Sequence, residues 1–335
     1  MYSKIEFLTS DSEYINQIKL FINEWFNEND YIISKTSGST GFPKEIKLKK
    51  TSLRYSARMT GNYFKFKETD NLLLSLPIFG IGGKMIIIRA IEFNTNLIVT
   101  APQKNPLRLV QHLKIKIASF VPYQINKIIE EDKSLFDNIE NILIGGAAIN
   151  QSIINKLRSI KSDCFETFGM TETYSHIALK NIKKENYFTV FDSIKIDSFN
   201  NCLCIIAPSL GIDVLLTNDI IELKNEKQFR WIGRSDNVIN SGGIKLHPEE
   251  IEKKLESVID CPFFISKEVN SEFGEIVILI IESNKPIELD IIKKLKQILS
   301  SFEMPKKNYF IENFIYTNTQ KINRLETMKK LNIER

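Results

Sequence analysis

Apolar residues recur at helical spacing near the start of this 335-residue chain and then gather into short runs. In residues 13–26, Ile15, Ile18, Phe21 and Ile22 share one face of a helix, so this stretch predicts an amphipathic helix. Short apolar runs then alternate with helical stretches as far as about residue 180, among them NLLLSLP, TNLIVTA, IASFVP and NILIGGAA. Such alternation is typical of an α/β fold with a largely parallel, layered sheet.

Between the first helix and these runs, the pattern predicts two strands and a second helix. Residues 31–34, YIIS, have the composition of a short strand, and Ile46 and Leu48 alternate with polar residues in a second one. A helix follows within residues 50–64, and Thr51 or Ser52 is expected to cap it because a hydroxyl side chain can accept from the free backbone N–H groups of a first turn.

After about residue 180 the chain loses its helical stretches. The strands YFTVFDSIKID, CLCIIAP, DVLLTNDIIEL and QFRWIG follow one another with turns between them, which predicts a small, mainly antiparallel β subdomain. Pro248 then opens a helix whose apolar face carries Ile251, Leu255 and Val258, and the remainder forms an α+β unit of roughly 100 residues. We therefore expect a large domain over residues 1–235, a small mobile domain over 236–335, and a hinge at Asp236.

Composition and charge exclude several classes of function. The chain is 43% hydrophobic and 26% charged, and its 45 basic and 41 acidic residues leave a formal net charge of +4 without a Lys/Arg-rich arm. This balance argues against a nucleic-acid or membrane partner. The four cysteines lack metal or redox spacing, and neither a signal peptide nor a run of 18 apolar residues is present. We expect a cytoplasmic protein with reduced thiols that acts on small molecules.

Residues 34–48, SKTSGSTGFPKEIKL, have two interpretations. Glycines let backbone N–H groups approach a polyphosphate, hydroxyl groups donate to its oxygens, and Lys44 would add a cation. The alternative is an ordinary surface turn. The stretch is not a Walker loop, because its glycines and lysine do not fit G-x-x-x-x-G-K-[ST].

Three further segments carry candidate chemistry. In FETFGMTETYS, Glu172 is a candidate Mg²⁺ ligand and Phe168 a candidate stacking partner for a base, although Thr171 with its neighbouring glutamate is also typical of a helix N-terminus. Asp219 and Arg234 have groups that would hold ribose hydroxyls, and Lys321 stands in a polar loop before a last helix. The alternatives are that Asp219 is an acidic residue in a turn, that Arg234 is an ordinary surface residue, and that Lys321 belongs to a solvated basic C-terminal segment. The three scattered histidines and the lack of G-x-S-x-G argue against a zinc site or a Ser–His–Asp triad.

Taken in order, these segments resemble the core motifs of the acyl-adenylate-forming (AMP-binding) superfamily of acyl-CoA synthetases, adenylation domains and luciferases. TSGSTGFPK resembles its phosphate loop and ILIGGAAI its adenine-side segment. FGMTET is similar to Y-G-x-T-E, TND with GRSDNVINSGGIKLHPEEIE to T-G-D with the G-R-x-D hinge motif, and TQKINR to the terminal G-K-x-x-R. Such enzymes join a carboxylic acid to AMP from MgATP, release pyrophosphate, and pass the acyl group to a thiol such as coenzyme A.

The resemblance implies a role for each matched residue. The β- and γ-phosphates would lie on the phosphate loop, Mg²⁺ on Glu172, and the ribose on Asp219 and Arg234. The adenine would lie beside Phe168 and the Gly145–Ala148 segment. Asp236 would be the pivot of the small domain. The implied catalytic residues are Thr171, Glu172 and Lys321, and the implied ATP/AMP-binding residues are Thr36, Ser37, Gly38, Ser39, Thr40, Gly41, Lys44, Gly145, Gly146, Ala147, Phe168, Gly169, Met170, Asp219 and Arg234.

The acid to be activated is indicated by two segments. SLPIFGIGGKMIIIRA contains no acidic residue but does contain Lys84 and Arg89, which suits a substrate with an additional carboxylate, and Gly83 is expected in the same pocket. ASFVPYQINKII resembles the S-x-V-P-x-Q-[IL] segment of o-succinylbenzoate–CoA ligases of menaquinone biosynthesis. The expected reaction is therefore the ATP- and Mg²⁺-dependent ligation of o-succinylbenzoate to coenzyme A. The succinyl group would then carry the activated carboxylate, and the benzoate is expected near Lys84. The alternatives are a ligase for another aryl or short acyl acid, with CoA or a carrier protein as acceptor, and a non-catalytic nucleotide-binding relative.

The chain departs from the superfamily pattern in several places. Its phosphate loop begins at residue 36, so an N-terminal region of roughly a hundred or more residues is expected to be missing. The sheet should then have a different edge, covered by the first helix or by a second subunit. Asn218 and Gln320 replace glycines, Phe168 replaces a tyrosine, and Gly80 stands where many relatives have histidine.

Overall fold

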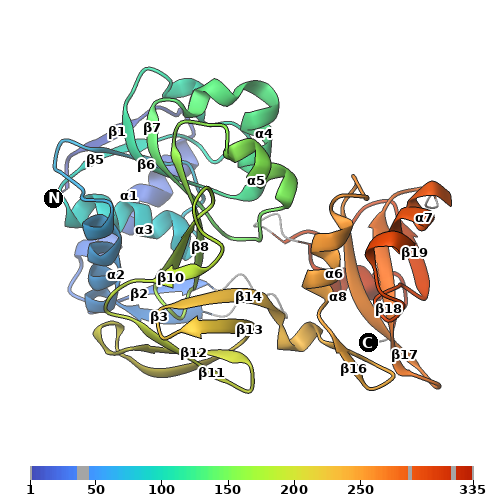
Figure 1. Ribbon diagram of the computed structural model, residues 1–335. Helices are drawn as coiled ribbons and strands as arrows, with labels where there is room; N and C mark the ends of the chain where they lie inside the picture. Colours follow the sequence, from blue (N-terminus) through green and yellow to red (C-terminus); the bar gives the residue numbers. More distant parts are fainter. Residues whose placement is uncertain (1, 36–44, 286–288, 318–321, 334–335) are drawn as a thin grey trace.

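One long sheet forms the body of the larger part of the protein. The computed structural model describes residues 2–35, 45–285, 289–317 and 322–333. In the first half of the 12-stranded sheet all neighbouring strands are parallel, in the order β1-β5-β4-β6-β7-β8 (Figure 1). These strands are β1 (Ile5–Phe7), β4 (Asn71–Leu74), β5 (Asn96–Val99), β6 (Ile115–Phe120), β7 (Ile139–Ile144) and β8 (Asp163–Met170).

The second half of the same sheet is antiparallel. A hairpin between β8 and β9 reverses the strand direction, and the order continues β9-β10-β14-β13-β12-β11. The predicted β subdomain is thus hydrogen-bonded to the parallel strands and continues their sheet. The prediction of a mixed α/β fold is confirmed. The strands are β9 (Ser175–Asn181), β10 (Phe188–Val190), β11 (Lys195–Phe199), β12 (Cys202–Ala207), β13 (Ile212–Asn225) and β14 (Gln228–Arg234).

Helices cover both faces of the parallel strands. Alternating residues of β4 belong to different cores: Leu72 and Leu74 pack in the cluster that includes α1, α2 and α3, whereas Leu73 packs in the cluster that includes α4 and α5. This alternation follows from the two-residue period of a strand. The helices are α1 (Ser12–Phe26), α2 (Lys50–Tyr63), α3 (Ile81–Glu92), α4 (Pro122–Asp132) and α5 (Gln151–Leu157), with 3-10 turns at Leu107–Leu109, Lys133–Phe136 and Pro208–Leu210.

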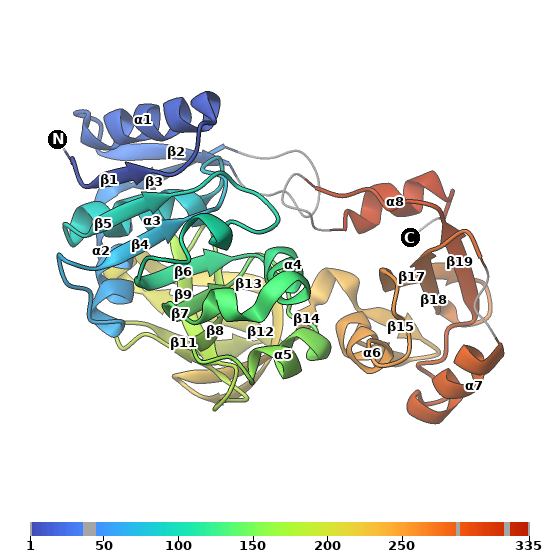
Figure 2. The same ribbon diagram turned by 90° about the horizontal axis from the view of Figure 1, so that it is seen from above.

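The N-terminal segment supplies both an edge strand and a covering helix. β1 pairs with β5 at the end of the sheet, and α1 forms where the apolar period predicts it. Ile18 and Trp25 of α1 are buried, and the Tyr14 hydroxyl donates to the Leu76 carbonyl at 2.7 Å. Figure 2 shows α1 and the two-stranded sheet of β2 (Tyr31–Lys35) and β3 (Glu45–Lys49) beside this edge.

The start of α2 differs from the prediction. The helix begins at Lys50, and Lys49 stands at the cap position without a side-chain cap hydrogen bond. The expected cap at Thr51 or Ser52 is therefore wrong. Ser52 is buried in the first turn, where its hydroxyl donates to the Leu210 carbonyl at 2.9 Å, so tertiary contact holds this end of the helix.

A second sheet with its own buried clusters follows a short connection. The chain leaves β14 at Arg234, passes through a 3-10 turn at Ser235–Asn237, and enters β15 at Ile239. The predicted boundary after residue 235 lies in this connection. α6 begins at Pro248 and buries Ile251 and Leu255, as predicted, but it ends at Leu255, so Val258 lies beyond the helix. The elements are β15 (Ile239–Ser241), β16 (Ile244–Leu246), α6 (Pro248–Leu255), β17 (Phe263–Asn270), β18 (Gly274–Glu282), α7 (Leu289–Ile298), β19 (Lys307–Ile311) and α8 (Arg324–Lys330).

Within the described ranges, none of the helices combines the length and the apolar character needed to cross a membrane.

Candidate active site

Two of the predicted segments fall outside the described residues. They comprise the phosphate-loop residues Thr36, Ser37, Gly38, Ser39, Thr40, Gly41 and Lys44, and the candidate catalytic residue Lys321. Their flanks are described: Lys35 pairs with Glu45 across the strands that bracket the first segment. Tyr316 and Ile322 form an antiparallel bridge on either side of the second.

The predicted adenine-side segment follows β7 directly. The Gly145 N–H donates to the Phe120 carbonyl at 3.1 Å, which joins the end of β7 to that of the parallel strand β6. Gly146 has φ = +87°, a conformation that favours glycine, and both Gly146 and Ala147 are exposed. An exposed turn at the carboxyl ends of parallel strands is the usual position for a ligand in an open α/β sheet.

Phe168, Gly169 and Met170 end β8, next to that turn. The Phe168 ring packs against Phe229 of β14, with ring centroids 5.0 Å apart and planes at 81°. Gly169 lies so close to the backbone of Ser175 and His176 that a Cβ atom would clash with it. The last residues of β8 are therefore fixed by packing on β14 and by the tight hairpin to β9.

Glu172 projects from the turn of the β8–β9 hairpin. Thr173 closes this turn: its hydroxyl accepts from the Met170 N–H at 2.9 Å and donates to the Ser175 carbonyl at 2.8 Å. The alternative that Thr171 begins a helix is thus wrong. Glu172 is exposed and has no hydrogen-bond or ion-pair partner within the described residues. Since those residues contain no cluster of three His, Cys, Asp or Glu side chains, a Mg²⁺ ion on Glu172 would need phosphate and water oxygens as its other ligands.

Asp219 and Arg234 are directly opposite each other in the β13–β14 pair. Asp219 is buried, accepts from Trp231 Nε1 at 2.9 Å, and lies 3.7 Å from Arg234 Nη1. Burial raises the pKa of the Asp219 carboxyl, while Trp231 and Arg234 oppose that rise. The two residues predicted to hold a ribose are therefore adjacent, and Asp219 keeps a second oxygen beside the guanidinium.

Asp236, the predicted hinge residue, is bound by two neighbours from the larger sheet. Arg234 Nη2 lies 2.9 Å from Asp236 Oδ2, and the Asn218 amide donates to both carboxylate oxygens at 3.1 and 3.3 Å. Asn218 stands where the superfamily has glycine, so this substitution supplies a contact to the connection between the two sheets.

The three residues of the predicted acyl pocket are all on α3 but differ in environment. Gly83 packs against the Pro77 backbone. Lys84 points toward α1 and β2: its ammonium donates to the Ile33 carbonyl at 2.6 Å and lies 5.4 Å from the Phe21 ring centroid. Arg89 points toward the start of β9, where its Nη2 donates to the Ser175 hydroxyl at 3.0 Å.

Arg89 is a buried cation without a carboxylate partner in the described part of the chain. It is 3% exposed, and its Nε is buried without a hydrogen-bond partner. Burial lowers the pKa of Arg89 to about 9, which still leaves the guanidinium charged at neutral pH. An unpaired buried charge is costly, so a group of opposite charge is expected to bind here.

Sequence reasoning missed four residues that lie beside the predicted site residues or beside the connection between the sheets. Trp231 holds Asp219, His176 and Thr60 lie behind Arg89, and Glu249 accepts from the Asn237 amide at 2.6 Å next to the connection. The tryptophan in QFRWIGR, which lies opposite Ile221 on the strand paired with that of Asp219, was a local signal for one of them. The contacts of His176 with Arg89 and Thr60 join residues that are far apart in the chain.

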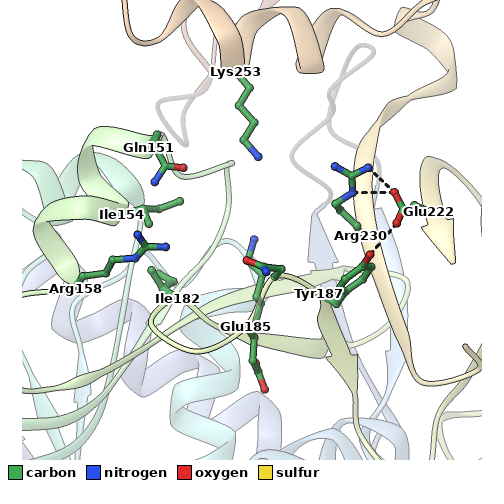
Figure 3. A pocket seen from close by; sticks show the side chains of 11 residues that line it. Gln151, Ile154, Arg158, Ile182, Glu185, Tyr187, Glu222, Arg230 and Lys253 are labelled. Atoms are coloured by element: carbon green, nitrogen blue, oxygen red, sulfur yellow. Dashed lines mark hydrogen bonds and ion pairs between the residues drawn. The ribbon is translucent and has the colours of Figure 1, made fainter. Parts of the chain in front are cut away.

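A hollow of about 440 Å³ lies away from these residues, between α5, β14 and α6 (Figure 3). Lys253 of α6 extends toward it from one side, and Arg158, directly after α5, lines the other. The carboxylate of Glu222, on the wall of the hollow, already has partners within the protein: it accepts from the Tyr187 hydroxyl at 2.8 Å and from Arg230 Nε at 3.1 Å. None of the predicted nucleotide-binding residues lines the hollow.

More than half of the chain, residues 7–196, matches the family model described as AMP-binding enzyme. A curated relative, the 2-succinylbenzoate–CoA ligase of Haemophilus influenzae, is 25% identical over 334 residues, which cover 92% of this chain and 73% of that protein.

Two solved structures share the fold. The acyl-CoA synthetase (AMP-forming)/AMP-acid ligase II-like protein of Dyadobacter fermentans has a TM-score of 0.64 and 31% identity, over 96% of this chain and 95% of that one. The O-succinylbenzoate coenzyme A synthetase of Bacillus subtilis, in complex with ATP and magnesium ion, has a TM-score of 0.78 and 20% identity, over 88% and 69%.

Proposed function

The chain belongs to the AMP-binding enzyme family, and on that premise we propose that it ligates o-succinylbenzoate to coenzyme A at the expense of ATP. The named relative in Haemophilus influenzae supports this substrate, as does the acid-free segment of residues 75–90, which contains Lys84 and Arg89. The product is the thioester of the succinyl carboxylate, which belongs to menaquinone biosynthesis.

The proposed reaction has two steps. A carboxylate oxygen of the acid attacks the α-phosphorus of ATP, so a C–O–P bond forms, the bond to the β-phosphate breaks, and pyrophosphate leaves. The coenzyme A thiolate then attacks the acyl carbon, so a C–S bond forms and AMP leaves with the electrons of the broken C–O bond. Catalysis of the first step is mainly positioning and charge neutralisation.

The nucleotide would bind along the carboxyl ends of β7 and β8. Gly145, Gly146, Ala147, Phe168, Gly169 and Met170 would contact the adenine side, and Asp219 with Arg234 would bind the ribose hydroxyls. The loop of Thr36–Lys44 would bind the triphosphate, and Lys321 would approach the reacting carboxylate and α-phosphate. Glu172, with Thr171 beside it, would contribute one oxygen ligand to Mg²⁺, which supplies charge neutralisation on the phosphates.

The observation that carries the proposed substrate is the unpaired Arg89 guanidinium. Its Nε has no partner among the described residues, and the two partners of Nη2 are neutral groups, Ser175 and His176. A substrate with a second carboxylate would supply the missing negative charge, and Arg–carboxylate pairs are strong because two N–H groups can donate together. The ring carboxylate of o-succinylbenzoate meets this need, while its aliphatic carboxylate reacts.

Lys84 is less suited to this task than Arg89. Its ammonium already donates to the Ile33 carbonyl and rests on the Phe21 ring, and burial lowers its pKa. We therefore assign the carboxylate contact to Arg89 and a role in holding α1 against α3 to Lys84.

Mass detection of the acyl-CoA product tests the function. With o-succinylbenzoate, ATP, Mg²⁺ and coenzyme A, we expect the thioester, AMP and pyrophosphate in equal amounts. A panel of benzoate, short fatty acids and aryl acids, each offered with coenzyme A or a carrier protein, should turn over at least tenfold more slowly, the loss expected when an Arg–carboxylate contact is missing. Clear turnover of a panel acid without turnover of o-succinylbenzoate would overturn the substrate. No pyrophosphate release with any acid would overturn the enzymatic function.

A further inference from the structure

We propose that His176, itself held by Thr60, is a positioning residue that fixes the Arg89 guanidinium for the second carboxylate of the substrate. The inference rests on the proposed function, because it concerns how Arg89 is presented to a dicarboxylic acid. It adds two residues, on β9 and α2, that no motif of the family-like segments contains.

The three side chains form a buried row across α3, β9 and α2. Arg89 Nη2 lies 3.5 Å from His176 Nδ1, and His176 Nε2 lies 3.0 Å from the Thr60 hydroxyl. The row ends at the Ser56 carbonyl, 3.3 Å from the Thr60 hydroxyl. Arg89, His176 and Thr60 are 3%, 8% and 0% exposed, so water does not compete for these contacts.

The number of hydrogens on each group fixes the donor and the acceptor of every hydrogen bond in the row. Arginine only donates, so the Nδ1 atom of His176 must carry the lone pair and its Nε2 the hydrogen. Nε2–H then donates to the Thr60 hydroxyl, and that hydroxyl donates to the Ser56 carbonyl in turn. Hydrogen bonds that run in one direction polarise one another, which strengthens the contact at the Arg89 end.

A neutral His176 is required by this arrangement. A protonated ring would direct an Nδ1–H toward a guanidinium N–H and would bring two cations together. Burial and the neighbouring Arg89 hold the pKa of His176 well below its usual range, in agreement with the geometry. His176 thus acts as an uncharged acceptor that leaves the positive charge of Arg89 available.

The row also determines which donors of Arg89 remain for a substrate. Ser175 and His176 together occupy both hydrogens of Nη2. Within the described structure, Nε is buried without a hydrogen-bond partner, so a free donor lies on the Nε edge of a guanidinium whose rotation is blocked. Preorganised donors lose less conformational entropy when a carboxylate binds, and a misaligned guanidinium would lose part of this advantage.

The test compares o-succinylbenzoate with 4-oxo-4-phenylbutyrate, which is the same acid without its ring carboxylate. The readout is the ratio of the two kcat/KM values, which a general loss of folded enzyme does not change. Thr60→Val removes the hydroxyl at nearly constant volume, and Thr60→Ser restores it. We expect Thr60→Val and His176→Phe each to lower the ratio about fivefold through KM for o-succinylbenzoate, the size of one neutral hydrogen bond, and Thr60→Ser to return it to the wild-type value.

Arg89→Ala separates the two hypotheses. We expect it to lower the ratio by roughly 100-fold, because it removes a charged contact. If Arg89→Ala leaves the ratio unchanged, the proposed substrate contact is wrong. A different result is that Arg89→Ala lowers the ratio while Thr60→Val and His176→Phe leave it at the wild-type value. In that case the contact of Arg89 with the substrate carboxylate is supported, and the positioning role of His176 and Thr60 is wrong. Thermal unfolding of each variant confirms that the kinetics are measured on folded protein.

Discussion

The side-chain amide of Asn218 donates to both carboxylate oxygens of Asp236, at 3.1 and 3.3 Å. One residue is on β13 and the other lies in the short turn between the two sheets. Because the proposed hinge residue is held from the side of the larger sheet, the turn should open less readily than a free connection.

Asn218→Gly should therefore loosen the turn. The Val238 amide, which donates to the Ser235 carbonyl at 3.3 Å, reports its opening. We expect hydrogen exchange of Val238 to accelerate about fivefold, because the lost contacts are worth about 1 kcal/mol. Asn218→Asp should accelerate it further through repulsion of Asp236. Equal exchange in wild type and both variants would show that this contact does not restrain the turn.

Trp231→Phe should weaken nucleotide binding while the hydrophobic contact of the ring is kept. The indole N–H that donates to Asp219 Oδ1 is lost, so a buried carboxylate loses one of the groups that keep it ionised and oriented. We expect KM for ATP to rise about fivefold, with a smaller change in kcat, in steady-state pyrophosphate release. Asp219→Ala, which removes the ribose contact itself, is the reference for complete loss and should have the larger effect.

Lys321→Ala should separate the two half-reactions. The resemblance of TQKINR to the terminal superfamily motif assigns this lysine to adenylation, where negative charge accumulates on the carboxylate and α-phosphate. We expect acyl-AMP formation to fall by at least 1,000-fold, a loss of about 4 kcal/mol in transition-state stabilisation. Coenzyme A thioester formation from supplied acyl-AMP should remain within a factor of about three. Equal retention of both half-reactions would contradict the role of Lys321.

Stability should fall below neutral pH through His176. Its pKa is lowered in the folded protein, so the unfolded chain binds a proton first as pH decreases. Folding is then weakened as pH falls through about 6.5, the pKa of an unperturbed histidine, by about 1.4 kcal/mol between pH 7.5 and 5.5. Urea unfolding at both pH values should show this loss in wild type and a correspondingly smaller one in His176→Phe, where the titrating group is absent.

The start of α2 can be checked with two neighbouring alanine variants. Ser52→Ala removes a buried hydroxyl from the Leu210 carbonyl, so the free energy of unfolding should fall by about 1 kcal/mol. Thr51 is exposed in the first turn, and Thr51→Ala should change it by less than about 0.5 kcal/mol. The reverse order in urea unfolding would indicate that Thr51 caps the helix after all.

The elements that sequence could predict are those specified by neighbouring residues. α1 follows from an apolar period, α6 from Pro248 and its buried face, and the membership of the family from motifs that are each continuous in the chain. The cap of α2 was misjudged because a hydroxyl in a first turn looks the same whether it binds its own helix or, like Ser52, a carbonyl 158 residues away.

The contacts that position the candidate site residues could not be predicted from neighbouring residues in the sequence. Thr60, Arg89 and His176 come from three elements, and their spacing in the chain carries no sign of their proximity. The continuity of the sheet was missed for a similar reason. β14 pairs with β10 although three strands, β11, β12 and β13, lie between them in the chain, and no local period predicts that pairing.

Arg234 is the last residue of β14, and its guanidinium lies near two carboxylates. Nη1 is 3.7 Å from Asp219 Oδ2, and Nη2 is 2.9 Å from Asp236 Oδ2. A nucleotide at the proposed ribose site that drew this guanidinium away from Asp236 would weaken its contact to the connection between the sheets. Thermodynamic reciprocity then requires the converse: a movement of the small domain that displaces Asp236 alters the affinity for the nucleotide by the same factor. If the proposed ribose site and hinge are correct, this one side chain would couple nucleotide binding to the orientation of the second sheet.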